Sequence, residues 1–247
     1  MPLKDVIVMI INCGCKMINT YLYPIKDGYV MIDTGYEDSL KRVAACLDSK
    51  HLSFNDVLYV FLTHAHDDHC GFLKELLIKF PHIKVICHPD AIDILLKGEN
   101  SFDGYCTGLN AYLYCKILNL FNKKTNRFPA IDEFLLERFI LVDSANLDYI
   151  EGILQAKVLF TPGHTKDSIS LMVGNDIFCG DLCRNSFPTN NKMSIWVMDN
   201  VKLKSSWDKV IELKPYLIYP AHGKPIGYQE LIKYKDKIDD IKVYKLK

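Results

Sequence analysis

The stretch Thr63-His64-Ala65-His66-Asp67-Asp68-His69 decides how this chain is interpreted, because it places three imidazoles within six residues. It follows directly on residues 57–62, an apolar run with the length of a buried strand. Side chains two residues apart point the same way in an extended chain, so we expect His64, His66 and Asp68 on one face and a helix starting where the motif ends. A bound cation would offset the free-energy cost of placing three imidazoles and a carboxylate together at the end of a buried strand. The alternative is a solvated loop whose histidines hydrogen-bond locally.

Three later turns favour the metal interpretation. Each follows an expected strand and contains one further residue of a metal-binding type, and these turns are Pro162-Gly163-His164-Thr165, Cys179-Gly180-Asp181 and Pro220-Ala221-His222-Gly223. Five of the eight histidines in the chain then lie in turns at strand ends. Histidines scattered through a core would not follow this pattern, so the turns predict one shared metal site.

The composition of the whole chain excludes several other classes of protein. Its 247 residues include 30 Lys and Arg against 30 Asp and Glu, and 49% of them are hydrophobic, which is ordinary for a globular protein. Zero net charge argues against binding nucleic acid by neutralising phosphates. The longest early apolar run, residues 6–11, is too short for a membrane span or a signal sequence. We expect a soluble cytoplasmic monomer or homodimer that acts on a small-molecule substrate and binds neither nucleic acid nor membrane.

The number and spread of the cysteines also indicate a cytoplasmic protein. There are nine of them, an odd number, spread over a chain that is too large to need a disulfide scaffold. We therefore expect mostly free thiols in a reducing environment. Cys13-Gly14-Cys15 resembles half of a metal site but has no partner pair, so we interpret it as a tight turn.

Short strands followed by helices occur twice along the chain, which predicts an α+β fold. Strands are expected at residues 6–11, 19–25, 29–32, 57–62, 84–87, 139–142, 157–160, 169–173, 176–179 and 216–219. Helices are expected at residues 37–50, 71–80, 89–96, 205–213 and 228–241. In each half, one loop also ends in a short turn that contains an aspartate, Asp33 in the first half and Asp181 in the second. We expect two similar β-then-α halves packed sheet on sheet, with the helices outside.

Residues 98–137 interrupt this scheme and are rich in aromatic side chains, with a helix expected at 109–121. No linker or low-complexity stretch divides the chain. We expect a single domain, residues 1–247, with a helical insert at about 98–137. This insert is interpreted as a lid over the site, as an interface or as extra packing on the core.

The ligand-type residues together resemble the metallo-β-lactamase superfamily of metallohydrolases. The HxHxDH run of residues 64–69 is matched in full, and the later histidine, aspartate and final histidine follow in the family's order, so that the resemblance covers about residues 18–223. It implies a four-layer αβ/βα sandwich with two metal ions at one edge between the sheets. The implied ligands are His64, His66 and His164 for the first metal, Asp68, His69 and His222 for the second, and Asp181 bridging both.

This ligand set suits two Zn²⁺ ions per chain, although iron or manganese would also accept it. A hydroxide bridging the two metals would be the nucleophile, and Asp68 would orient it and pass its proton to the leaving group. Asp33, in Ile32-Asp33-Thr34-Gly35, occupies a position where family members carry an aspartate that supports the metal-binding loop. Its alternative is an Asx-turn that caps the helix expected from Glu37.

Several differences from other members of the superfamily indicate a glyoxalase II-like or lactonase-like branch rather than the true β-lactamases. The β-lactamases usually have cysteine where this chain has Asp181, and long glyoxalase II enzymes continue well beyond the last ligand, whereas 24 residues follow Gly223 here. Lactonases tend to have tyrosine where this chain has Arg184. We interpret Arg184 and Lys192 as contacts to a substrate carboxylate or phosphate, with solvated loop charges as the alternative.

The expected activity is hydrolysis of small esters, thioesters or lactones by a metal-dependent enzyme. Three alternatives remain at this point. The first is a phosphodiesterase or nuclease, since two-metal sites also serve in-line displacement. The second is an oxidoreductase with a single iron, similar to the persulfide dioxygenases of the family. The third is a binding protein that keeps a metal site without catalysis.

Overall fold

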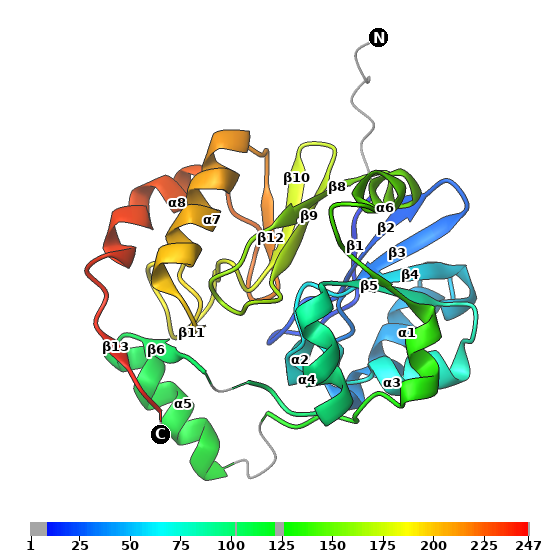
Figure 1. Ribbon diagram of the computed structural model, residues 1–247, viewed down its shortest axis with the longest axis horizontal. Coiled ribbons are helices and arrows are strands. Elements are labelled where there is room, and N and C mark those ends of the chain that lie inside the picture. The colour runs from blue at the N-terminus through cyan, green and yellow to red at the C-terminus, as the bar shows by residue number, and fades with distance from the viewer. Residues whose placement is uncertain (1–8, 102, 122–125, 247) are drawn as a thin grey trace.

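Two β-sheets lie face to face between two outer layers of helices (Figure 1). The computed structural model describes residues 9–101, 103–121 and 126–246. Within these residues, no helix is long and apolar enough to cross a membrane. Half of the strand expected at 6–11, residues 6–8, lies outside the described residues, and the first strand observed is Ile11–Asn12.

The first sheet contains six strands, most of which were expected. In spatial order they are β1 (Ile11–Asn12), β2 (Tyr21–Ile25), β3 (Gly28–Ile32), β4 (Val57–Phe61), β5 (Lys84–Cys87) and β7 (Phe139–Leu141). The four strands from β3 to β7 run parallel. The carboxyl ends of β3 and β4 therefore meet at one edge, which brings the turn at Asp33 beside the motif that begins at Thr63.

The second sheet places the three later turns at a common edge in the same way. Its strands, in spatial order, are β12 (Ile218–Pro220), β10 (Asp176–Gly180), β9 (Ile169–Val173) and β8 (Lys157–Phe160). Because β9 is antiparallel to both β8 and β10, and β10 is parallel to β12, the strands β8, β10 and β12 all run in one direction. His164, Asp181 and His222 follow their carboxyl ends.

Helices cover the outer faces of both sheets (Figure 1). The first sheet is covered by α1 (Leu40–Asp48), α3 (Leu73–Lys79) and α4 (Ile92–Lys97), and the second by α7 (Asn200–Leu213) and α8 (Gln229–Tyr234). Two further helices are short: α2 (Asp67–Cys70) contains the end of the metal motif, and α6 (Leu147–Leu154) precedes β8. Helix α6 was not predicted. The helix expected at 228–241 is shorter, because α8 gives way to a 3₁₀ helix at Lys235–Ile238.

Three buried clusters hold the four layers together, one at each interface between layers. Alternation along the strands divides the side chains between them: Met31 faces the helices, whereas its neighbours Val30 and Ile32 face the second sheet. There they pack in the same cluster as Leu171 and Phe178, both fully buried. Such burial contributes about 1.5–3 kcal/mol per large side chain. The four-layer αβ/βα sandwich predicted from the sequence is confirmed.

Segment 98–137 contains the expected helix, α5 (Leu109–Phe121), together with a short strand that was not expected. This strand, β6 (Tyr105–Thr107), lies between β11 (Trp196–Val197) and β13 (Val243–Tyr244) in a small third sheet. Figure 1 shows these elements together beside the open end of the sandwich. Three segments far apart in the sequence therefore meet next to the edge that carries the histidines.

Candidate metal centre

The structure brings all seven predicted ligand residues together at one edge of the two sheets. Their donor atoms form three groups in which all atoms lie within 4.8 Å of one another: His64, His66 and His164; His64, His69 and Asp181; and Asp68, His69 and His222. Six of these side chains are buried, and Asp68 is half-buried. Residues more than 150 positions apart in the sequence thus share one small volume.

The first of these groups consists of imidazoles alone and is called the histidine group here. Nε2 of His64 lies 3.1 Å from Nδ1 of His66 and 3.1 Å from Nε2 of His164. Nε2 of His164 lies 3.2 Å from the same Nδ1 of His66. Three nitrogen donors therefore converge on one point, which is the arrangement that a tetrahedral zinc ion requires of its protein ligands.

The group of Asp68, His69 and His222 contains a carboxylate and is called the mixed group. Oδ2 of Asp68 lies 3.2 Å from Nε2 of His222, and its Oδ1 lies 3.8 Å from Nε2 of His69. These spacings leave room for a second cation between the three side chains.

Asp181 lies between the two groups and offers one oxygen to each. Its Oδ2 is 3.7 Å from Nε2 of His164, whereas its Oδ1 is 3.4 Å from Nε2 of His222 and 3.7 Å from Nε2 of His69. Among the described residues, Oδ1 of Asp181 and Nε2 of His69 are buried without any hydrogen-bond partner. Buried polar atoms without partners are costly, and a bound cation would satisfy both. The cluster therefore fits a divalent metal site.

Electrostatics keep the histidine group neutral. Burial, reinforced by the neighbouring imidazoles, lowers the pKa of His64 well below its ordinary value. Burial and His164 lower the pKa of His66 to about 3, and burial lowers that of His164. A neutral imidazole has a free lone pair, so all three nitrogens are available to a metal at neutral pH.

The mixed group is charged instead. Burial alone would lower the pKa of His69, but the carboxylates of Asp33, Asp68 and Asp181 outweigh it and raise this pKa to about 10. Burial would raise the pKa of Asp68, yet His69 and His222 hold it well below its usual range. The mixed group is therefore an internal ion-pair network in the absence of a metal, and a cation would displace the proton on His69.

Comparison with known proteins agrees with this geometry. The sequence pattern of the metallo-beta-lactamase superfamily matches residues 13–222. The chain belongs to this superfamily. Its members are mostly metal-dependent hydrolases, which accords with a His and Asp cluster that fits a metal site.

Two curated relatives of the superfamily are similar to most of this chain. The metallo-beta-lactamase fold-containing protein ST1585 of Sulfurisphaera tokodaii is 29% identical over 208 residues, which cover 78% of this chain and 68% of the relative. The beta-lactamase-like protein 2 homolog of Drosophila melanogaster is 24% identical over 235 residues, covering 91% of this chain and 68% of its own length.

Solved structures show the same fold. The crystal structure of ST1585 from Sulfolobus tokodaii has a TM-score of 0.62 at 21% identity and covers 93% of this chain and 85% of that one. The crystal structure of TTHA1623 in a di-iron-bound form has a TM-score of 0.62 at 21% identity, with 92% and 98% covered.

Asp33 supports the mixed group, as the superfamily resemblance implied. Its Oδ2 lies 2.8 Å from Nδ1 of His69, and its Oδ1 accepts a 2.8 Å hydrogen bond from the Thr63 backbone N–H. The 3₁₀ turn at Glu37 has no side-chain cap, so the alternative role in helix capping is not what the structure shows. Asp33 adopts a left-handed backbone, with φ of 56°, which aspartate tolerates better than most residues. This backbone turns its carboxylate towards His69.

Backbone carbonyls orient two further histidines. Nδ1 of His164 lies 2.8 Å from the carbonyl oxygen of Trp196, and Nδ1 of His222 lies 2.6 Å from that of Met17. Because a carbonyl only accepts, each Nδ1 donates its proton to that oxygen, and each Nε2 is left facing the centre as the atom that would bind a metal. Sequence reasoning missed these supports, since a backbone carbonyl has no residue signature.

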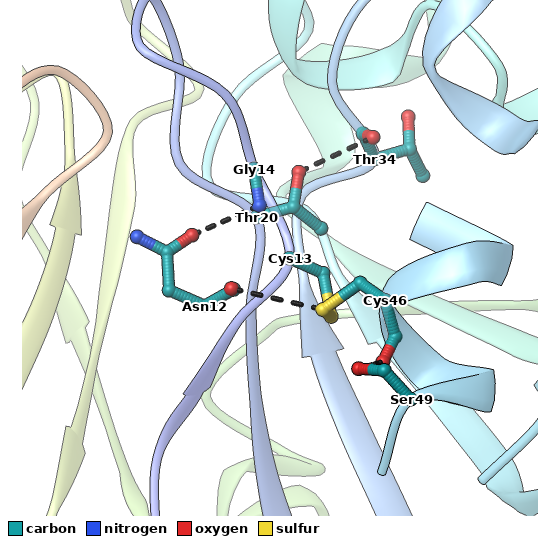
Figure 2. The surroundings of a disulfide bond; sticks show 7 residues. All are labelled: Asn12, Cys13, Gly14, Thr20, Thr34, Cys46 and Ser49. Atoms are coloured by element: carbon teal, nitrogen blue, oxygen red, sulfur yellow. Dashed lines mark hydrogen bonds between the residues drawn. A yellow bond between two sulfur atoms is a disulfide. The ribbon is translucent and has the colours of Figure 1, made fainter. Parts of the chain in front are cut away.

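The loop that supplies the Met17 carbonyl is fixed at its base by a disulfide between Cys13 and Cys46 of α1 (Figure 2). In the same region, Thr20 Oγ1 donates to the Thr34 carbonyl at 3.3 Å. The expectation of mostly free thiols is confirmed for seven cysteines, but Cys13 is bonded rather than simply part of a turn. Its partner is 33 residues away, so local spacing could not reveal the pair.

The helix after the motif starts earlier than the sequence predicted. His66 is its N-cap, with an extended backbone, and α2 begins at Asp67, so Asp68 and His69 project from the first helical turn, whereas His64 and His66 precede it. Asp67 points away from the centre, where its Oδ1 accepts a 2.6 Å hydrogen bond from Asn100 Nδ2. The two carboxylates are favoured at the positive end of a helix, which explains the early start.

The two predicted substrate contacts differ in the structure. Lys192 Nζ donates to Asn185 Oδ1 at 2.7 Å and lies 3.7 Å from a carboxylate oxygen of Glu230, so its charge is already compensated. Arg184 is buried beside the centre, without a carboxylate partner among the described residues. The two cations that the sequence treated alike therefore have different surroundings.

Proposed function

We propose that this protein is a dinuclear zinc-dependent hydrolase of small esters, thioesters or lactones. The observation that carries the proposal is the position of Asp181, with one oxygen towards the histidine group and the other towards the mixed group. Neutral imidazoles with few carboxylates suit zinc, although the superfamily neighbour in a di-iron form makes iron a metal to test. When bound, the two ions would bring the pKa of water towards ~7 and so supply a nucleophile near neutral pH.

The residues of the chain would bind the two ions and transfer the proton. His64, His66 and His164 would hold the first ion, while Asp68, His69 and His222 would hold the second, with Asp181 between them. The low pKa of Asp68, caused by His69 and His222 against the effect of burial, leaves its carboxylate ionised at neutral pH. Asp68 can therefore accept a hydrogen bond from the attacking water and carry a proton to the leaving group.

Three further expectations belong to the same proposal. The partner is a small molecule rather than a nucleic acid, since a neutral chain lacks the charge for phosphate binding. The seven free thiols support a cytoplasmic location. We also propose that residues 1–247 act as one domain, monomeric or homodimeric, with 98–137 inserted beside the site.

The test is metal analysis followed by a substrate panel. Protein purified without chelator should contain about two transition-metal ions per chain and should hydrolyse thioesters, esters or lactones once loaded with zinc. Absence of bound metal, even after refolding with zinc, would overturn the proposal. Bis-p-nitrophenyl phosphate and glutathione persulfide belong in the same panel. Turnover of either one without ester or thioester hydrolysis would replace it with a phosphodiesterase or an iron oxidoreductase.

A further inference from the structure

The start of helix α2 is capped by a residue of the insert rather than by its own N-cap. His66 occupies the N-cap position, but its imidazole faces the histidine group and forms no cap hydrogen bond. Asn100, with 9% of its surface exposed, takes over this task. Its Oδ1 accepts a 2.8 Å hydrogen bond from the Asp67 backbone N–H, and its Nδ2 donates to Asp67 Oδ1 at 2.6 Å. Both ends of one amide therefore hold the first residue of the helix that carries Asp68 and His69.

Thr107, in strand β6 of the same insert, holds a segment on the other side of the centre. Its backbone N–H donates to the Ile195 carbonyl at 3.0 Å, and its Oγ1 donates to the Ser194 carbonyl. Thr107 and Ser194 are both buried. One residue of the insert therefore fixes two consecutive carbonyl groups in a place that water does not reach.

The segment that Thr107 holds contacts two of the candidate ligands. Ser194 Oγ lies 3.1 Å from Nδ1 of His164 and donates to Oδ2 of Asp181 at 3.5 Å. Two residues later, the Trp196 carbonyl lies 2.8 Å from the same Nδ1. Oδ2 is also the oxygen of Asp181 that faces His164. These contacts therefore act on the side of the centre that belongs to the histidine group.

Such contacts matter because apolar packing alone does not set the spacing between the two sets of ligands. The two sheets meet through a buried apolar cluster, and hydrophobic burial is not directional. A functional site needs its side chains within about 0.5 Å of the productive geometry. Hydrogen bonds are directional, and the insert forms them with α2, which follows the first sheet's β4, and with residues 194–195, which follow the second sheet's β10.

We infer that Asn100 and Thr107, called the insert clamp here, are positioning residues of the metal centre. Asn100 acts on the mixed group through the start of α2, and Thr107 acts on the histidine group through Ser194 and Trp196. The inference rests on the proposed two-metal function and gives the insert a part in it, which is to hold the two ligand sets at the spacing that two ions need. Neither residue belongs to a ligand group, so each acts only through the ligands that it orients.

Zinc binding tests the insert clamp without relying on catalysis. Chelator competition gives the two affinities, and the reference variants His66→Ala and His222→Ala assign them to the two groups. Asn100→Ala should weaken the ion of the mixed group about 10-fold or more and leave the other within about twofold. Thr107→Val, which loses only the hydroxyl donor, should weaken the ion of the histidine group instead. Thr107→Ser, which keeps that donor, should restore the affinity.

Cobalt-loaded protein gives a spectroscopic readout that folding alone would not change, since its visible bands report the coordination geometry of each ion. Asn100→Ala and Thr107→Val should each alter the bands of one ion. The matched control is Ser101→Ala, which removes a hydroxyl that bonds Asp103 in the same segment and should leave both ions unchanged. Variants with a lower Tm without metal but with wild-type zinc affinities and cobalt bands would overturn the inference, and so would equal losses at both groups in both variants.

The insert clamp and the hydrolase proposal fail in different ways. Two zinc ions that depend on Asn100 and Thr107 as predicted, in a protein that hydrolyses no ester, thioester or lactone, would overturn the hydrolase and leave the clamp intact. Ester or thioester hydrolysis by a protein whose zinc affinities neither Asn100→Ala nor Thr107→Val changes would overturn the clamp and leave the hydrolase intact.

Discussion

The histidine group and the mixed group lie side by side but are prepared for a cation in opposite ways. In the histidine group, nitrogens 3.1–3.2 Å apart belong to imidazoles whose pKa values are lowered, first by burial. In the mixed group, carboxylates hold His69 protonated, with a pKa raised to about 10. One half of the centre therefore offers neutral donors, and the other half offers negative charge that is already compensated by a proton.

This difference predicts unequal roles for two ions. Neutral nitrogen donors favour a borderline-soft ion such as zinc, whereas a group with carboxylates accepts harder ions as well. Metal binding to the mixed group also requires His69 to lose its proton. The metal affinity of the mixed group should therefore fall more steeply with decreasing pH than that of the histidine group. The predictions below test whether the two groups act independently in this way.

Removal of a donor from the histidine group should have the largest effect. His66→Ala leaves two nitrogens where a tetrahedral ion needs at least three protein ligands, so we expect one metal ion fewer per chain and kcat lower by about a thousandfold or more. Metal analysis and steady-state kinetics measure both. His82→Ala, at an exposed histidine outside the centre, is the control. Full activity of His66→Ala would show that the centre is not used for catalysis.

Loss of the support for the mixed group should have an intermediate effect. Asp33→Asn removes the charge that fixes Nδ1–H of His69 at 2.8 Å, and such changes weaken metal binding by about 10- to 100-fold. Competition with a chelator should show this loss for one of the two ions only. An equal loss at both sites would contradict the independence of the groups. Asp48→Asn, at an exposed residue of α1, controls for charge.

Loss of the disulfide should weaken metal binding to the mixed group less than loss of the Asp33 carboxylate does. Cys13→Ser frees the base of the loop whose Met17 carbonyl orients His222, while the backbone hydrogen bonds of that loop remain. We expect a loss of ~2–4 kcal/mol in unfolding free energy but a smaller loss of metal affinity than in Asp33→Asn. Thermal unfolding and chelator competition check these two results. The nearby free thiol provides the control Cys15→Ser, and identical unfolding of both variants would contradict the expectation.

The pH dependence of the metal-free protein should show the smallest effect. Burial and His164 lower the pKa of His66 from 6.5 to about 3, so stability is lost as the pH falls from 6.5 towards 3 and the unfolded chain takes up a proton. The pKa of His69 is raised from 6.5 to about 10, so its contribution is present below 6.5 and lost as the pH rises towards 10. Tm should therefore be highest near pH 6.5, and Asp33→Asn should flatten the alkaline side. A wild-type Tm that rises steadily above pH 7 would contradict this balance.

The meeting of the seven candidate ligand residues could be predicted from the sequence, because they lie in segments that follow strands. Strands that run in one direction end at the same edge of their sheet, so the turns after β8, β10 and β12 gather at one edge of the second sheet, and the packing of the two sheets then brings them to the turn after β4. Local patterns also predicted α5 at its observed bounds. Asp33, in the turn after β3, was singled out through the resemblance to the superfamily rather than through its own sequence surroundings.

Features that depend on long-range contacts could not be predicted. The bond between Cys13 and Cys46 and the hydrogen bonds between Asp67 and Asn100 join segments that only the finished fold brings together. The start of α2 was misplaced because alternation along the motif is compatible with a strand, while the charge preference of a helix start acts over a few residues only. Lys192 and Arg184 looked equivalent because a sequence shows a charge but not its partner.

The small sheet beside the centre should be less stable than the two sheets of the sandwich. Its strand β13 is two residues long and lies near the carboxyl-terminal end, where Tyr244 stacks on Tyr112 of α5 at 5.4 Å. Strands of two residues have few backbone hydrogen bonds and open locally far more often than the core does. Each such opening removes one neighbour of β6 and a contact of α5. Hydrogen exchange can time this opening, so mobility beside the centre and the strength of metal binding can be measured independently.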